Sequence, residues 1–206
     1  MIINCGPVHD LRELRIGLPE RKSKIAVFVS GGIDSAILYY LLCLENKLHQ
    51  NMHEIVPLTV YRKEGSKNFA RLVISHVNAS LEKSYTEPLI VGNNQLPEPE
   101  QVKSGVCEAE KLGFNLAYTG LIQQLPQHMI NWQPIPYSET DFFKAPFKNL
   151  NKSHIIDLCV KFNQESLFYL THSCSASEIS RCNDCNGCNE RTWGFEQLKL
   201  VDPGKI

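Results

Sequence analysis

The sequence predicts an α/β protein built on a parallel sheet with helices on both faces. Three observations lead to this fold class: short apolar runs recur along the chain, stretches of helical spacing follow them, and turn-forming residues separate the two. The first run covers residues 25–29, a Ser-Gly-Gly-Ile-Asp-Ser turn follows at 30–35, and an apolar helical stretch covers 36–44. Alternating strands and helices form parallel sheets, and such sheets bind ligands beyond the carboxyl ends of their strands.

Further strands and helices continue this alternation. The expected strands lie at 55–60, 89–91 and 115–119, and the expected helices at 69–81, 101–112 and 152–162. Gly113 directly follows the helix at 101–112 and is the residue type that commonly ends a helix. Residues 1–23 show no pattern that predicts structure.

The composition is that of an ordinary globular protein. Of the 206 residues 43% are hydrophobic, and 21 Lys and Arg stand against 22 Asp and Glu. This balance provides no positive field for a phosphate backbone, so we expect no nucleic-acid partner. In the first half of the chain no apolar run approaches the roughly 18 residues that span a membrane, and the first 24 residues lack a signal peptide. We expect a soluble, cytoplasmic protein with a single domain over 1–206, of which 165–206 form a C-terminal segment.

The turn at 30–35 has the properties of a phosphate-binding loop. Gly31 and Gly32 let the backbone approach an anion closely, Ser30 and Ser35 offer hydroxyl donors, and the following helix presents its positive end. The spacing differs from the Gly-x-Gly-x-x-Gly of dinucleotide-binding folds and from the Walker loop of kinases and GTPases. A plain helix cap with a tight turn is the alternative interpretation.

Four of the eight cysteines lie close together near the end of the sequence. Cys174, Cys182, Cys185 and Cys188 follow the spacing Cys-x7-Cys-x2-Cys-x2-Cys among turn-forming Asn, Asp and Gly residues. Four thiolates satisfy a tetrahedral structural zinc ion, which is the interpretation that we favour, and we expect this segment to be helical in part. An iron–sulfur cluster also uses four cysteines, and four unligated buried cysteines are the remaining alternative.

The loop at 30–35 resembles the pyrophosphate loop, Ser-Gly-Gly-x-Asp-Ser, of the N-type ATP pyrophosphatases. In that family the loop holds the phosphates of ATP while a substrate carbonyl or carboxylate is adenylated and pyrophosphate leaves. The resemblance implies a Rossmann-like sheet of the adenine nucleotide alpha hydrolase type. It also assigns an ATP-binding role to Ser30, Gly31, Gly32, Asp34 and Ser35, with Asp34 near Mg²⁺ and the phosphates.

Further motifs narrow the resemblance. Tyr-Thr-Gly at 118–120, Ala-Pro-Phe-Lys-Asn-Leu-Asn-Lys at 145–152 and Cys-Asn-Gly-Cys-Asn-Glu-Arg at 185–191 are similar to motifs of the 7-cyano-7-deazaguanine synthases of the queuosine pathway. Those ATP-dependent ligases adenylate 7-carboxy-7-deazaguanine, convert it to an amide with ammonia, and dehydrate the amide to the nitrile with a second ATP. The resemblance implies ATP, Mg²⁺ and Zn²⁺ as cofactors and is compatible with a homodimer.

This resemblance also assigns roles to individual residues. Asp34 and Lys152 are the expected catalytic residues, Thr119 and Gly120 join the ATP site, and the four cysteines hold zinc. Judged from its position alone, Lys152 would be a solvated lysine at the start of a helix. Arg191, Lys199 and Lys205 belong to a mildly basic tail that we expect to be solvated.

The sequence departs from the family on the substrate side. Arg62 and Lys63 stand where Gly-Gln is expected after the second strand, Val-Lys-Ser-Gly at 102–105 replaces an expected Arg-Asn pair, and residues 125–129 lack an expected Tyr-Pro-Asp-Cys-Arg pattern. The loop at 120–147 nevertheless offers groups for stacking on a flat heterocycle and pairing with its edge, unless they only pack against the sheet. These groups are Trp132, Tyr137, Phe142, Phe143, Gln123, Gln124 and Asn131.

Three other functions stay open at this point. The chain could adenylate a different carboxylate, or it could belong to the tRNA-thiolating relatives that adenylate a base and deliver sulfur. The latter would need a sulfur-carrying cysteine near the loop and a basic docking surface, and neither is evident. The third alternative is a non-catalytic nucleotide-binding or zinc-binding protein that has kept the scaffold.

Overall fold

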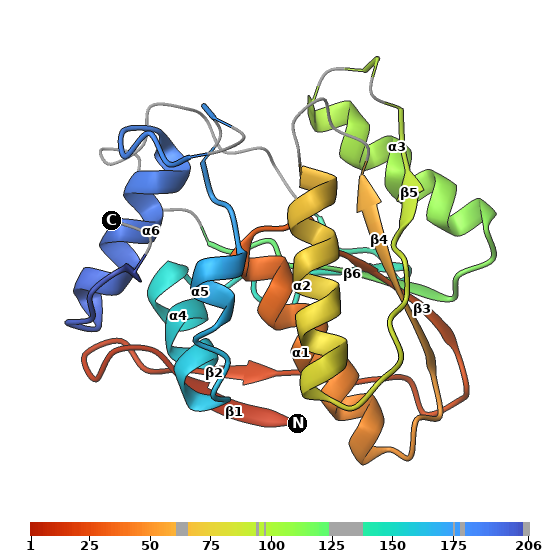
Figure 1. The fold of residues 1–206 in the computed structure, drawn as a ribbon. Helices are drawn as coiled ribbons and strands as arrows, with labels where there is room; N and C mark the ends of the chain where they lie inside the picture. Colours follow the sequence, from red (N-terminus) through yellow and green to blue (C-terminus); the bar gives the residue numbers. More distant parts are fainter. Residues whose placement is uncertain are drawn as a thin grey trace.

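A five-stranded, all-parallel sheet forms the centre of the computed structural model, with strand order β5-β4-β3-β6-β7 (Figure 1). The strands are β3 (Lys24–Phe28), β4 (Glu54–Val60), β5 (Leu89–Val91), β6 (Leu116–Thr119) and β7 (Phe143–Lys144). The structure describes residues 1–60, 66–93, 95–96, 98–123, 138–174, 176–177 and 180–203. The parallel Rossmann-like sheet predicted from the sequence is thereby confirmed.

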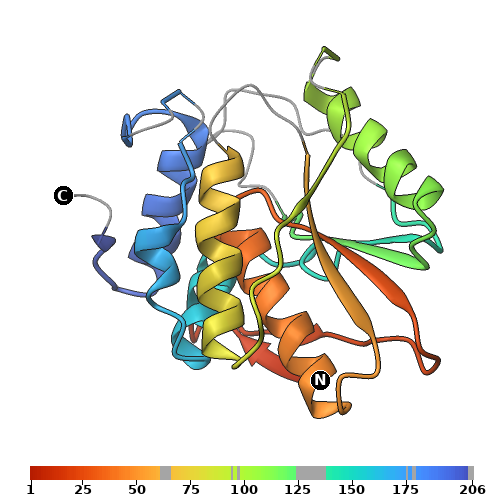
Figure 2. The same ribbon diagram turned by 45° about the vertical axis from the view of Figure 1, so that its right-hand side comes forward.

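Helices cover both faces of this sheet (Figure 2). Successive side chains of a strand point to opposite faces, and β3 accordingly places Ile25 and Val27 in one apolar core and Ala26 and Phe28 in another. The first core lies under α1 (Ile33–Leu48), α2 (Ser66–Ser80) and α4 (Lys152–Lys161), and the second lies under α3 (Glu98–Lys111). The short α5 (Leu167–Leu170) and α6 (Asn186–Gln197) complete the first layer.

Four elements, β1 (Ile2–Cys5), β2 (Arg12–Arg15), β7 and α5, were absent from the sequence prediction. The chain begins with an antiparallel hairpin of β1 and β2, which packs against α4. The expected rim loop at 120–147 contains β7, which pairs with β6 at the edge of the sheet, and α5 also went unpredicted. Gly113 adopts a φ of 78° after α3 and ends that helix as predicted.

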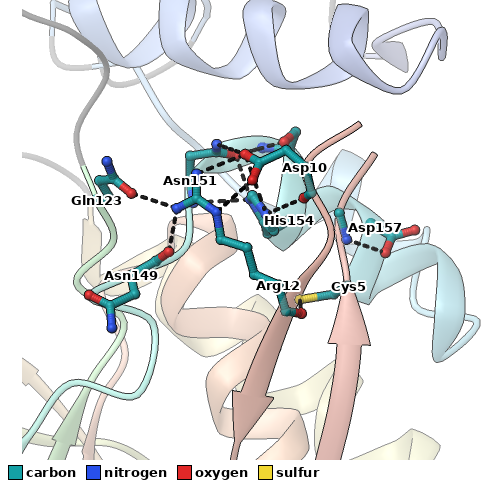
Figure 3. Close-up of polar contacts among 10 residues, drawn as sticks. Cys5, Asp10, Arg12, Gln123, Asn149, Asn151, His154 and Asp157 are labelled. Atoms are coloured by element: carbon teal, nitrogen blue, oxygen red, sulfur yellow. Dashed lines mark hydrogen bonds and ion pairs between the residues drawn. The ribbon is translucent and has the colours of Figure 1, made fainter. Parts of the chain in front are cut away.

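A polar network fastens the N-terminal hairpin to the first turn of α4 (Figure 3). The Arg12 guanidinium donates to Asp10 at 2.8 Å, to Gln123 Oε1 at 2.6 Å and to the Asn149 carbonyl at 2.5 Å. On α4, the Asn151 side chain caps the helix by accepting from the Ser153 N–H at 3.0 Å. The hairpin and this cap together fix where α4 begins, and therefore where its first residue points.

None of the helices within the described ranges has the length and apolar character needed to cross a bilayer.

The Asn151 cap gives a stability prediction. Asn151→Ala removes the acceptor for the first turn of α4, so we expect it to lower the free energy of unfolding by about 1–2 kcal/mol. Asn149→Ala is the matched control, because Asn149 is exposed and only its backbone carbonyl takes part in the network. Urea unfolding of both variants measures the difference, and equal stabilities would contradict the role of the cap.

Candidate functional site

The Ser30–Ser35 turn lies at the carboxyl end of β3 and leads directly into α1. Ser35 Oγ closes the turn, since it accepts from the Ser30 N–H at 3.0 Å and donates to the Gly32 carbonyl at 3.1 Å. Gly32 is the N-cap of α1 and has no side chain to satisfy the first turn. The amides of that turn have no partner within the helix and give this end a partial positive charge, so the local geometry suits an anion.

Gly31 is required here for two reasons. Its φ of +85° is unfavourable for other residues, and a Cβ on it would lie 2.5 Å from Phe69 Cβ on α2. Its carbonyl accepts from the His172 N–H at 3.0 Å, and the His172 ring stacks on Phe69 with centroids 4.6 Å apart. The turn is therefore enclosed by α2 on one side and by the segment that leads to the cysteines on the other.

Lys152 reaches this turn from the first residue of α4. Its Nζ donates to both carboxylate oxygens of Asp34, at 2.6 and 2.7 Å, and lies 3.2 Å from Glu190 Oε2 on α6. Only 3% of Lys152 is exposed, so the interpretation as a solvated lysine is wrong. The predicted pair Asp34 and Lys152 is brought together, and Glu190 is a third member that sequence reasoning did not single out.

Burial and charge act in opposite directions on these groups. Burial alone would lower the pKa of Lys152, but the carboxylates of Asp34 and Glu190 outweigh it and raise this pKa above its ordinary value. Burial raises the pKa of Glu190, against the attraction of Lys152. The lysine thus stays protonated at the positive end of α4, where a cation would otherwise be disfavoured.

A cavity of about 230 Å³ opens beside Asp34 at the carboxyl edge of the sheet. The polar residues that line it are Ser30, Asp34, Ser35 and Thr119, and the other lining residues are Phe28, Val29, Val60, Val102, Gly120 and Leu121. A Cβ on Gly120 would come within 2.8 Å of the Asp34 and Ser35 backbone. Thr119 and Gly120 were both predicted as site residues. Gly120 packs directly against the Ser30–Ser35 loop, and Thr119 lines the same cavity.

The four C-terminal cysteines also come together. Their sulfur atoms all lie within 4.8 Å of one another, and among the described residues they form the group that could hold a metal ion. Zn–S bonds of about 2.3 Å give sulfur–sulfur edges of about 3.8 Å in a tetrahedron, and Cys174 and Cys185 have Sγ atoms 3.9 Å apart. The sulfurs of a multi-iron cluster must stand further apart, so this spacing fits a single ion.

Local contacts shape this cluster. The Cys182 sulfur accepts from the Cys185 N–H at 3.2 Å, and a Cβ on Gly187 would collide with the Ser173 carbonyl. Burial raises the pKa of Cys174, but hydrogen bonds, chiefly from the backbone near Cys182, lower it more, which favours the thiolate. Burial and a hydrogen bond with Cys185 raise the pKa of Cys188 to about 11.

The sequence predicted that Arg191 belongs to a solvated tail, and this prediction is wrong; Lys205 lies outside the described residues. Arg191 is 1% exposed and pairs with Asp202 at 3.1 Å, and it donates to the Phe168 carbonyl at 2.5 Å and to Thr171 Oγ1 at 3.3 Å. These bonds tie α6 to the segment that runs from α5 into the cysteine cluster. Five hydrogen bonds from the buried guanidinium, three of them to the Asp202 carboxylate, explain why this arginine is internal.

Of the expected ring and amide groups of the rim loop, the three that the structure describes, Gln123, Phe142 and Phe143, are not among the residues that line the cavity. Phe143 is buried in the second core, edge-on to Phe28 at 6.0 Å, and Phe142 packs against that same core. The side-chain oxygen of Gln123 accepts a hydrogen bond from Arg12. The remaining four groups, Gln124, Asn131, Trp132 and Tyr137, lie outside the described residues, as do the departures at Arg62, Lys63 and 125–129.

Comparison with known proteins decides the family. The sequence profile described as queuosine biosynthesis protein QueC matches residues 94–199, which is just over half of the chain. The chain belongs to the QueC family. The matched region includes the end of β6, Lys152 and all four cysteines, whereas the Ser30–Ser35 turn precedes it.

Curated relatives of this QueC-family chain carry a consistent name. It is 32% identical over 103 residues to the 7-cyano-7-deazaguanine synthase of Campylobacter jejuni subsp. jejuni and 26% identical over 106 residues to that of Oceanobacillus iheyensis. These alignments cover 50% and 52% of this chain but 44% and 46% of the relatives, so the chain matches somewhat under half of their length.

A solved structure is also similar to this QueC-family chain. It is the U34-tRNA thiolase NcsA from Methanococcus maripaludis with its [4Fe-4S] cluster, with 12% identity, a TM-score of 0.41 and coverage of 91% of this chain and 76% of that one.

The close approach at Gly120 predicts a strong effect of a single methyl group. Gly120→Ala forces the end of β6 away from the first turn of α1, and we expect the free energy of unfolding to fall by about 1–3 kcal/mol. Gly17→Ala is the control, because a Cβ at Gly17 meets no atom within 4 Å, and we expect a change within about 0.5 kcal/mol. Thermal unfolding compares them, and a Gly120 variant as stable as the Gly17 variant would show that the contact is not tight.

Proposed function

We propose that this chain binds ATP with Mg²⁺ at the Ser30–Ser35 loop and converts 7-carboxy-7-deazaguanine and ammonia into 7-cyano-7-deazaguanine through the amide. The observation that carries the proposal is the convergence of the loop, the ion pair between Asp34 and the buried Lys152, and the cavity at one edge of the sheet. Membership of the QueC family supports the substrate. We also propose that residues 1–206 act as one unit, with 165–206 as its metal-binding segment.

The loop and the first turn of α1 are suited to hold the phosphate chain. Their amides and the Ser30 and Ser35 hydroxyls face the developing negative charge, and the adjacent cavity receives the nucleoside. Asp34 is the carboxylate available to hold Mg²⁺, and the ion when bound supplies charge neutralisation at the phosphates. In this proposal Lys152 exchanges Asp34 for a phosphate oxygen and stays protonated throughout.

The proposed reaction uses these groups twice. A carboxylate oxygen of the substrate attacks the α-phosphorus of ATP, the bond to the leaving pyrophosphate breaks, and ammonia then displaces AMP to give the amide. In the second round the amide oxygen attacks the α-phosphorus of another ATP and pyrophosphate leaves. Loss of AMP and the two nitrogen-bound protons gives the nitrile.

Activation explains why a pyrophosphate loop is useful here. A carboxylate oxygen is a poor leaving group toward ammonia, and adenylation turns it into the phosphate oxygen of AMP. The residues named above would lower the barrier by stabilising charge on the α-phosphate and the leaving pyrophosphate.

We further propose a structural Zn²⁺ ion held by Cys174, Cys182, Cys185 and Cys188. The short separations of their sulfur atoms support a single ion with thiolate ligands. The ion would supply a fixed geometry at the start of α6 rather than take part in the chemistry, because four protein ligands leave no open position.

The proposed reaction gives a direct assay. Wild-type protein incubated with 7-carboxy-7-deazaguanine, ATP, Mg²⁺ and ammonium should produce the amide and the nitrile, measured by mass spectrometry, with release of pyrophosphate. Asp34→Ala should reduce pyrophosphate release by about 100-fold or more, since it removes the ligand for Mg²⁺ at the phosphates. Glu20→Ala, at an exposed position outside the site, should leave it unchanged. Turnover of ATP with a different carboxylate, and none with this acid, would overturn the substrate.

The zinc proposal is tested by elemental analysis. We expect one zinc per chain in protein purified under reducing conditions, and a ratio near zero in Cys185→Ser, because a three-thiolate site binds zinc much more weakly. Cys107→Ser should keep the full ratio, since Cys107 is an exposed cysteine on α3 outside the cluster. Iron accompanied by visible absorbance would contradict the assignment.

A further inference from the structure

Residues that flank the cysteine cluster reach the Ser30–Ser35 loop on one side of the cluster and Lys152 on the other. Two residues before Cys174, the backbone N–H of His172 donates to the Gly31 carbonyl at 3.0 Å. Two residues after Cys188, the Glu190 carboxylate lies 3.2 Å from Lys152 Nζ. The first and last ligands thus each stand two residues away from a group that touches the loop or its lysine.

Helix α6 also fixes the aliphatic part of Lys152. A Cβ on Gly194 would lie 2.8 Å from Lys152 Cγ and 2.8 Å from Ile156 Cδ1, so α6 packs closely over this side chain. The stem of Lys152 is therefore held by Gly194 and its ammonium by Glu190. Both residues belong to the helix whose first turn carries Cys188.

The remaining connection passes through Arg191. Its bonds to the Phe168 carbonyl and to Thr171 Oγ1 join α6 to the residues immediately before His172. His172 in turn stacks on Phe69, whose Cβ lies against Gly31. A displacement of the start of α6 would therefore shift the contacts of Gly31 as well as those of Lys152.

We propose that the cysteine cluster and the phosphate loop are thermodynamically coupled sites, with Glu190 as the positioning residue that carries the coupling from the cluster to Lys152. The inference rests on the proposed ATP and zinc sites and adds a regulatory link between them. Metal binding sets the position of α6, α6 sets the position of the Lys152 ammonium through Glu190, and this sets the affinity of the loop for nucleotide. Linkage then requires that nucleotide tightens metal binding by the same factor.

The coupling is measured as a ratio of affinities. Calorimetric titration with Mg²⁺ and a non-hydrolysable α,β-methylene analogue of ATP is carried out on zinc-loaded protein and on protein treated with a zinc-selective chelator that spares Mg²⁺. We expect the dissociation constant to rise by at least about five-fold when zinc is removed. In Glu190→Gln we expect this ratio to shrink toward one, whereas Glu196→Gln, an exposed carboxylate on the same helix, should keep the wild-type ratio.

A second measurement needs no zinc-free protein. When the loaded protein is equilibrated with a competing colorimetric chelator, the dissociation constant for zinc should be at least about five-fold lower with the nucleotide analogue present, and this difference should vanish in Glu190→Gln. A merely structural role for Glu190 would change stability but leave the ratio between the two states intact. Equal ratios in Glu190→Gln and wild type would overturn the inference. Failure of zinc-loaded wild type to bind the analogue at all would instead overturn the proposed ATP site.

Discussion

A single buried ammonium group organises this site. Lys152 places its charge where almost none of the residue is exposed, and an isolated ion in such surroundings would be strongly destabilising. Asp34 and Glu190 make the position tolerable, and they come from α1 and α6, which lie far apart in the sequence. Neither helix can move away without leaving a charge unpaired, so this contact specifies how the C-terminal segment sits on the sheet.

The constraint extends backwards to the N-terminal hairpin. Lys152 is the first residue of α4, so its direction depends on where that helix begins, and the cap at Asn151 decides this. Arg12 holds the adjoining Asn149 carbonyl and the Gln123 side chain in one cluster. A hairpin with no group in the site therefore contributes to the site, because it holds the chain just before α4 and the side chain of Gln123, two residues after Leu121 of the cavity lining.

Elements that are specified by a local sequence signal could be predicted, whereas elements that depend on contacts with distant residues could not. Four strands of the central sheet, β3 to β6, and the Ser30–Ser35 turn were predictable, since a contiguous apolar run or glycine turn carries its own structural preference. The hairpin escaped because Arg-Glu-Leu-Arg in β2 offers one apolar side chain, Leu14, and β7 escaped because it spans two residues. The four cysteines were found together because their short spacing forces proximity.

Glu190 and Arg191 show why the rest of the site could not be predicted from pattern. Both are charged residues on a weakly amphipathic helix, where such side chains usually face solvent. They belong to the family motif at 185–191, but the motif does not indicate that they turn inward. Their roles depend on partners far away in the sequence, Lys152 for one and Asp202 for the other. Three glycines allow the close packing around these charges. A Cβ on Gly31, Gly120 or Gly194 would collide with a neighbouring segment of the chain. Close approach without side-chain bulk is what brings two carboxylates from different helices to the same ammonium group.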